Sequence, residues 1–265
     1  MRYFNQGDQL TLFEMPPLTR VVNVASVPQR SPFRYPGGKT WLVPRIRQWL
    51  RSLAWKPTIF VEPFAGGAIV GLTVAFERLA ERVLLVELDD QVAAVWKTIL
   101  SGGNEWLARR IVSFNLTASN VRTELESKGS STRQKAFRTL LKNRTFHGGI
   151  LAPGSSLIKS GENGKGLRSR WYPQTLARRI RAIAQIRDRI SFVEGDGITA
   201  IQQREKQRHA AFFIDPPYTV GGKKAGARLY TYYTLEHEKL FACTKRVAGG
   251  FLMTYDNADG VSILA

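Results

Sequence analysis

The chain has 265 residues, 43% of them hydrophobic, so it can bury a core as one large domain or one domain with an insertion. Its single cysteine, Cys243, excludes an intrachain disulfide framework and a cysteine-based zinc site, and we expect a cytoplasmic protein without a membrane span, secretory leader or metal. The net charge of +18 is concentrated, because residues 101–190 hold 18 Lys/Arg and 5 Asp/Glu. This imbalance favours a polyanionic partner over a merely solvated basic surface.

Short β-branched or aromatic runs alternate with helical patterns along most of the chain. Residues 1–30 lack a periodic core and are expected to form a flexible tail. Helices are expected at 41–50, 69–79 and 90–100, and strands at 58–62, 83–87, 191–194, 211–214 and 251–255. The alternation predicts an α/β fold with a parallel sheet covered on both faces. Most strands end in or near an acid, at the edge where such sheets bind ligands: Glu62, Glu87, Asp196 and Asp215.

Residues 101–190 interrupt this alternation. They contain a helical pattern at 133–142, a loop at 153–169 rich in glycine, serine and lysine, and a helix that follows Pro173. One face of this last helix is expected to carry Leu176, Ile180, Ile183, Ile186 and Ile190. We therefore expect a discontinuous catalytic domain of residues 31–100 and 191–265, with residues 101–190 as an inserted domain.

The segment 31–40 reads SPFRYPGGKT and precedes a predicted helix. Tyr35 could stack or hydrogen-bond, Gly37 and Gly38 would allow close backbone approach, and Lys39 could reach a carboxylate or a nucleic acid. Read alone, the segment is as well explained by a turn before the helix.

The segment 58–71, TIFVEPFAGGAIVG, runs from a strand through Glu62, Pro63 and Phe64 into a glycine turn at Gly66. Glycines at a strand-to-helix turn let a ligand approach the backbone. The spacing is not G-x-G-x-x-G, and Glu62 would repel a phosphate, so a cationic or amine-bearing ligand is favoured. Glu87 ends the next strand, where an acid can accept both hydrogen bonds of a ribose diol. S-adenosylmethionine, a nucleoside that carries an amino acid, meets both requirements.

The segment 211–218, AFFIDPPY, ends a predicted buried strand in Asp215, Pro216, Pro217 and Tyr218. An isolated Asp-Pro pair is commonly a capped turn, but the full tetrapeptide is more specific. Consecutive prolines fix the backbone and leave the Pro216 carbonyl free to point outward. Asp215 and that carbonyl can accept the two N–H groups of an exocyclic amine, and Tyr218 offers a face on which an extruded base can stack. These four residues are the candidate catalytic residues for a direct methyl transfer.

The three segments, in this order and with a basic insert between the second and third, resemble the Dam-type (D12 class) DNA adenine N6-methyltransferases. The matching stretches are 33–39, 61–67 and 215–218, and the resemblance extends from about residue 31 to the C-terminus. It implies a Rossmann-like, S-adenosylmethionine-dependent methyltransferase fold with an inserted helical target-recognition domain. The implied substrate is adenine N6 in double-stranded DNA.

The resemblance also implies site residues. It places Tyr35, Lys39, Glu87 and Asp215 at the S-adenosylmethionine site, and the expected cofactor set is completed by Gly38, Glu62, Pro63, Phe64, Gly66 and Asp196. Glu87 stands where the family usually has aspartate and Tyr35 where it often has tryptophan, and both changes keep the chemistry. Asn143-Arg144 followed by Gly148-Gly149 looks like the family pattern in the recognition domain. The candidate DNA contacts are Asn143, Arg144, Lys159, Lys165, Arg168 and Arg170. The loop differs from that of GATC-reading members, so the recognition sequence stays open.

Two features near the ends of the chain carry separate expectations. Gln9-Leu10-Thr11-Leu12-Phe13 looks like the QLxLF-type peptide by which bacterial proteins dock on the replication sliding clamp; the alternative is a short terminal strand. The chain ends at Ala265, whereas the resembled enzymes continue through a final β-hairpin, which indicates a trimmed chain, a divergent short form or half of a split protein. A missing hairpin would expose a strand edge and could compromise stability or activity.

Three other functions compete with this interpretation. The first is methylation of RNA or of cytosine N4, although Asp215 rather than serine favours adenine. The second is a DNA-binding relative that has lost catalysis, supported only by the short C-terminus. The third is a nicotinamide oxidoreductase, which Glu62 in the phosphate turn argues against.

Overall fold

The structure is a computed structural model that describes residues 23–34, 37–127, 131–161, 164–217 and 235–255. The peptide Gln9–Phe13, the candidate site residues Tyr35 and Tyr218, and everything after Tyr255 lie outside the described residues.

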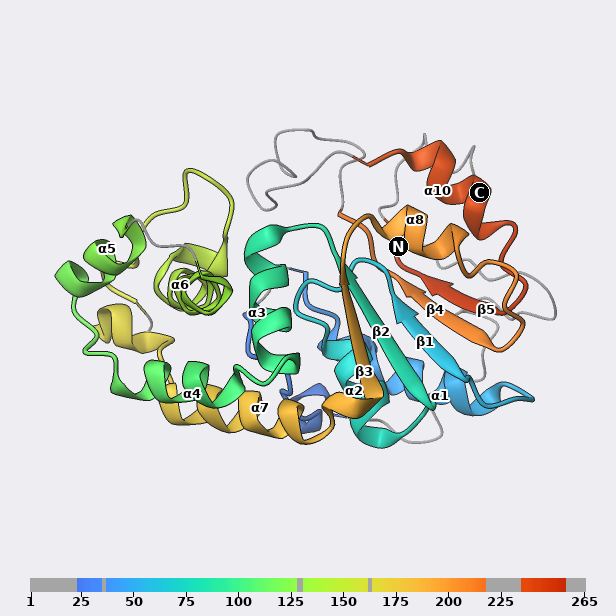
Figure 1. Ribbon diagram of the computed structural model, residues 1–265, viewed down its shortest axis with the longest axis horizontal. Coiled ribbons are helices and arrows are strands. Elements are labelled where there is room, and N and C mark those ends of the chain that lie inside the picture. Colours follow the sequence, from blue (N-terminus) through green and yellow to red (C-terminus); the bar gives the residue numbers. More distant parts are fainter. Residues whose placement is uncertain (1–22, 35–36, 128–130, 162–163, 218–234, 256–265) are drawn as a thin grey trace.

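Within the described residues, five parallel strands form one sheet in the order β3-β2-β1-β4-β5 (Figure 1). They are β1 Ile59–Glu62, β2 Arg82–Glu87, β3 Ile190–Glu194, β4 Ala210–Ile214 and β5 Gly250–Met253. All five expected strands are confirmed within two residues of the predicted ends. On one side of the sheet β1 is followed by β2 and β3, and on the other side β4 is followed by β5. The strand order therefore changes direction between the neighbours β1 and β4. In open α/β sheets a ligand binds outside the carboxyl ends of the strands at such a switch point.

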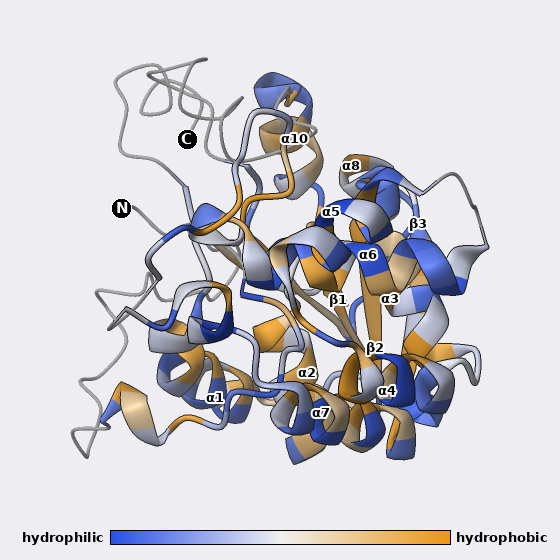
Figure 2. Ribbon diagram, turned by 90° about the vertical axis from the view of Figure 1, so that its left-hand side faces the viewer, coloured by the Kyte–Doolittle hydropathy of each residue, from blue (hydrophilic) through white to orange (hydrophobic). Residues whose placement is uncertain are grey.

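Side chains alternate between the two faces of the sheet, and each face packs against its own helices. Phe60 and Phe213 belong to a core shared with α1 Val43–Ser52, α2 Ile69–Glu77 and α3 Asp90–Leu100. Val61 and Phe212 belong to a second core shared with α8 Gly197–Gln202 and α10 His237–Thr244. This period of two is what a strand buried on both sides requires. Figure 2 shows hydrophobic residues concentrated on the strands and hydrophilic residues on the outer sides of the helices.

Among the described residues, four helices follow α3 before β3: the first three lie beyond α3 at one end of the molecule, and the last runs beneath α3 towards β3 (Figure 1). They are α4 Asn104–Ser113, α5 Ala118–Glu126, α6 Thr132–Thr145 and α7 Pro173–Gln185. Phe137 on α6 and Ile180 on α7 belong to the same core as Phe60 on the sheet. The helical region that the sequence predicts therefore exists, but its core is continuous with that of the sheet.

Several helix ends differ from the sequence prediction for local reasons. α7 ends at Gln185, and Ile190 begins β3 instead of continuing the helical face, because the 3-10 turn Arg187–Arg189 interrupts the periodicity. The predicted helix at 41–50 begins as the 3-10 turn Thr40–Leu42 and becomes α1 at Val43, which puts a proline in the first turn of α1, where prolines are tolerated. Further 3-10 turns in the described part of the chain are Val24–Ser26, His147–Gly149 and Gly166–Ser169.

The last part of the expected tail packs on the domain. Val27 is 2% exposed within the core, and Arg30 pairs with Glu77 on α2 at 3.3 Å. The Arg30 guanidinium also lies over the Phe76 ring, 4.3 Å from its centroid. Val27 and Arg30, at the end of the expected tail, therefore have partners on the domain, while most other residues of 23–30 are exposed.

Candidate functional site

A pocket of about 500 Å³ opens at the carboxyl ends of β1, β2 and β4. The four acids predicted to converge at this edge all line it: Glu62, Glu87, Asp196 and Asp215. Gly38, Lys39, Pro63, Phe64 and Gly66 line it as well. The volume lies within the range of sites for small molecules and cofactors. The sheet thus brings together segments that are far apart in the sequence.

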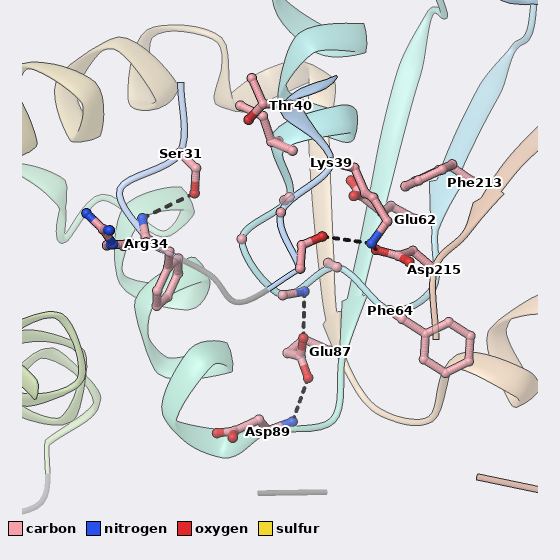
Figure 3. Close-up of a pocket in the computed structure, with 18 of the residues that line it drawn as sticks. Ser31, Arg34, Lys39, Thr40, Glu62, Phe64, Glu87, Asp89, Phe213 and Asp215 are labelled. Carbon is pink, nitrogen blue, oxygen red and sulfur yellow. Dashed lines mark hydrogen bonds and ion pairs between the residues drawn. The ribbon is translucent and has the colours of Figure 1, made fainter. Parts of the chain in front are cut away.

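Asp215, which directly follows β4, accepts hydrogen bonds from Lys39 (Figure 3) and from Thr254. Lys39 Nζ lies 2.7 Å from Asp215 Oδ2 and also donates to the Gly37 carbonyl at 2.7 Å. Thr254, just after β5, donates its hydroxyl to Asp215 Oδ1 at 2.5 Å. Lys39 is 4% exposed and the Asp215 side chain 20%, so this ion pair is well shielded from water. Sequence reasoning missed Thr254, because a threonine at the end of a strand carries no distinguishing signal.

Glu62 ends β1 beside this pair and is buried, with 3% exposure. Burial raises the pKa of the Glu62 carboxyl well above its usual range, although the hydrogen bond from the Gly71 amide, 2.7 Å from Oε2, lowers it. A Cβ on Gly71 would lie 2.5 Å from that same oxygen, so the glycine is what lets the carboxyl approach α2. A buried carboxyl in a pocket suits a polar or amine-bearing ligand group.

Glu87 ends β2, and both of its carboxyl oxygens accept backbone amides (Figure 3). The Gly66 N–H donates to Oε2 at 2.7 Å and the Asp89 N–H to Oε1 at 2.9 Å. Burial raises the pKa of Glu87 to about 7, against the lowering effect of these amides. Trp96 fixes the same turn by donating Nε1 to the Gly66 carbonyl at 3.0 Å. Because each carboxyl oxygen has two lone pairs, Glu87 keeps acceptor capacity for a ligand diol.

The sequence model of the D12 class N6 adenine-specific DNA methyltransferase family matches residues 35–261. The chain belongs to this family. It is therefore an S-adenosylmethionine-dependent enzyme that methylates adenine N6 in DNA. No curated protein matches the chain in sequence.

Two further observations concern metal ions and membranes. Within the part of the chain that the structure describes, this methyltransferase has no cluster of three or more His, Cys, Asp or Glu that could hold a metal ion. No helix among the described residues is long and apolar enough to cross a membrane.

Asp196 lines the methyltransferase pocket and caps a helix. It is the N-cap of α8, and its Oδ1 accepts from the Thr199 amide at 2.7 Å and from the Thr199 hydroxyl at 2.8 Å. The next residue, Gly197, packs so closely on the Pro63 carbonyl and the Phe64 ring that a Cβ would not fit. The α8 cap thus supports the Glu62-Pro63-Phe64 turn.

The expected DNA contacts fall into two groups in the structure. Lys159, Lys165 and Arg168 are exposed, and Arg170 is half-buried. Asn143 is fully buried and Arg144 is 7% exposed. A direct DNA contact by the Asn143 side chain does not fit this burial, because its amide is engaged with backbone groups of the chain.

Arg144 lines the pocket together with Arg34 and Arg179. Burial lowers the pKa of Arg144 to about 10, and the neighbouring charges of Arg179 and Arg34 lower it further. Sequence reasoning missed Arg34 and Arg179 as pocket residues. The signal was weak, since Arg179 is one of several arginines on α7 and only the fold shows which one turns towards the pocket.

Proposed function

We propose that the pocket holds S-adenosylmethionine, and that an adenine flipped out of duplex DNA presents its N6 amino group to Asp215 and the Pro216 carbonyl. The observation that carries the proposal is the fixed carboxylate of Asp215 at the switch point of the sheet, beside a pocket of cofactor size. Pro217 also lines this pocket, which supports a role for the whole Asp-Pro-Pro turn.

The residues of the pocket suit the parts of this cofactor. Glu87 is suited to accept the ribose hydroxyl groups, and Glu62 lies where an amine-bearing or cationic group would be favoured. The close turn at Gly66 leaves backbone accessible to a ligand. When bound, S-adenosylmethionine supplies a methyl group on a positively charged sulfur.

Asp215 is suited to bind and orient the amine. One of its oxygens accepts from Lys39 and the other from Thr254, so its plane is fixed before the substrate arrives. A carboxylate is a suitable acceptor for one N–H of adenine N6, and the Pro216 carbonyl can accept the second N–H. Two such bonds would direct the nitrogen lone pair towards the methyl group, and this positioning is the source of the rate enhancement we propose. Tyr218, as the base-stacking residue, and Tyr35, as a cofactor contact, remain sequence-based expectations.

The helices α4 to α7 are the proposed target-recognition region. Residues 101–190, which include these helices, contain 18 of the 39 Lys/Arg of the chain and only 5 of its 21 Asp/Glu. Lys159, Lys165 and Arg168 are exposed on the connection between α6 and α7, where a DNA backbone could reach them. Phosphate contacts of this kind supply affinity that does not depend on sequence.

Methyl transfer to defined nucleic acids tests the proposal. Labelled S-adenosylmethionine is incubated with the chain and with duplex DNA, adenine-free duplex DNA, single-stranded DNA or RNA. We expect label in adenine-containing duplex DNA, none after Asp215→Ala, and unchanged transfer after Asp188→Ala, a control at an exposed acid outside the pocket. Label found only in RNA, or in adenine-free DNA, would overturn the assignment. Mapping methylated positions in DNA from cells that express the chain then gives the recognition sequence.

The clamp peptide Gln9–Phe13 remains a separate hypothesis. Two leucines and a phenylalanine in a five-residue segment could fill an apolar pocket on the sliding clamp. If a chain lacking residues 1–20 bound the clamp as tightly as the full chain, the hypothesis would be wrong.

A further inference from the structure

Side chains from α6 and α7 make hydrogen bonds to the backbone of Ser31, Pro32 and Arg34, and we call residues 31–34 the anchored segment. Asn143 makes the closest set of contacts: its Oδ1 accepts the Arg34 N–H at 2.9 Å, and its Nδ2 donates to the Arg34 carbonyl at 2.9 Å. The Arg144 guanidinium donates to the Pro32 carbonyl, and Arg179 Nη1 donates to the Ser31 carbonyl at 3.0 Å.

The two bonds between Asn143 and Arg34 fix both the position and the direction of one residue of backbone. The side-chain amide pairs with the N–H and the carbonyl of Arg34 much as a neighbouring strand would. Its second N–H donates to the Gly149 carbonyl at 2.7 Å, so both N–H groups and the oxygen of the amide are engaged at a site with no exposure to water. A buried polar group without a partner lowers the free energy of unfolding, so this arrangement of hydrogen bonds is strongly favoured over alternatives.

Gly149, just after α6, allows this part of the chain to approach the anchored segment closely. Its backbone has a φ of +75°, and a Cβ there would collide with the Arg34 carbonyl oxygen. Gly154 offers a comparison within the same region: it also has a positive φ, of +85°, but a Cβ there would meet nothing within 4 Å. An alanine at either position strains the backbone, whereas only an alanine at Gly149 pushes on the anchored segment.

Residues of the anchored segment line the pocket, and so do the residues that come two positions further along the chain. Gly37, Gly38 and Lys39 follow it, and Lys39 reaches back to the Gly37 carbonyl and across to Asp215. The Leu42 N–H then donates to the Lys39 carbonyl at 3.0 Å, which joins this stretch to the start of α1. Because only two residues of chain separate Arg34 from Gly37, we expect a shift of the anchored segment to displace the backbone that carries Lys39.

We propose that Asn143 is a positioning residue that sets the cofactor site from helix α6, by fixing the anchored segment and through it Gly37, Gly38 and Lys39. This inference rests on the proposed function, since it takes the pocket beside Lys39 and Asp215 as the cofactor site. It gives Asn143 a role in cofactor binding in place of the DNA contact that the sequence suggested. It also ties the cofactor pocket physically to the helices proposed to bind DNA.

Two variants with matched controls test the inference. Asn143→Ala removes the three side-chain bonds, and Gly149→Ala pushes on the same carbonyl without changing Asn143. The controls are Thr145→Val, which removes a buried hydroxyl bonded only within α6 to the Leu141 carbonyl, and Gly154→Ala. Calorimetry measures the Kd of S-adenosylhomocysteine for each folded protein, and fluorescence anisotropy measures the Kd of duplex DNA. Hydrogen exchange measures how fast the backbone amides of the peptide 37–42 exchange with solvent.

We expect both test variants to weaken S-adenosylhomocysteine binding by about tenfold or more and to leave DNA affinity within about twofold. Exchange of the peptide 37–42 should be faster in both test variants and unchanged in both controls. If Asn143→Ala does not fold, the comparison of Gly149→Ala with Gly154→Ala tests the inference. Unchanged cofactor affinity and exchange in the folded test variants, or equal changes in the controls, would overturn the inference.

The two proposals fail in different ways. If the unmutated chain does not bind S-adenosylhomocysteine, the proposed cofactor site is wrong, and the exchange of the peptide 37–42 still reports whether Asn143 positions that stretch. If the unmutated chain binds and the variants bind equally well, the cofactor site stands and the positioning role is wrong.

Discussion

The pKa of Glu87 predicts how cofactor affinity depends on pH. A ribose diol donates two hydrogen bonds, so it favours the ionised carboxylate over the protonated acid. With a pKa of about 7, Glu87 is about one-tenth ionised at pH 6 and about nine-tenths ionised at pH 8. If only the ionised form binds the diol, S-adenosylhomocysteine should bind about tenfold more weakly at pH 6 than at pH 8, which is about 1.4 kcal/mol.

Titration calorimetry at pH 6, 7 and 8, at constant ionic strength, measures this dependence. Glu87→Gln keeps the shape of the side chain and cannot ionise, so it should bind weakly at all three values and lose most of the pH dependence. The variant also separates Glu87 from Glu62, the other pocket carboxyl whose pKa is raised by burial. A flat profile in the unmutated chain, or a tenfold dependence that survives in Glu87→Gln, would refute the reasoning.

The same shift affects the stability of the protein without ligand. The pKa of Glu87 is higher in the folded chain than its ordinary value of 4.5, so between about pH 4.5 and about pH 7 the folded state holds a proton that the unfolded state has released. The contribution of Glu87 to the free energy of unfolding is therefore largest at low pH and is lost as pH rises through this window. Glu87→Gln should remove that part of the slope in urea unfolding measured across the window.

Three other predictions use different readouts. Lys39→Met removes the ion pair with Asp215 and should lower the rate of methyl transfer more than about tenfold with DNA affinity retained; an unchanged rate would show that the pair has no catalytic role. Trp96→Phe removes the bond to the Gly66 turn and should lower the free energy of unfolding by about 1–3 kcal/mol in urea, whereas a loss below about 0.5 kcal/mol would contradict that bond's importance. Lys165→Ala and Arg168→Ala should each weaken DNA binding evenly across sequences and reduce the slope of log Kd against log salt by about 1, and slopes that do not change would place DNA elsewhere.

The agreement between sequence and structure is best where the signal is local. α3 occupies the predicted residues 90–100, because an acidic N-cap and a continuous apolar face define it within the helix itself. The prediction failed at Ile190, where the apolar spacing of α7 continued by coincidence into β3. Nor does any local pattern indicate the burial of Val27, which depends on elements far away in the chain.

The sequence by itself determined the strands and the acids that end them, because strand propensity, glycine turns and the Asp-Pro-Pro-Tyr motif are written in a few adjacent residues. It also determined the family, through the order of three motifs. Only the tertiary structure decided which donors hold Asp215 and what Asn143 does. Thr254 and Lys39 reach Asp215 across 39 and 176 residues of sequence, and Asn143 reaches Arg34 across 109. Contacts at such separations follow from the packing of the sheet and helices, and no local pattern encodes them.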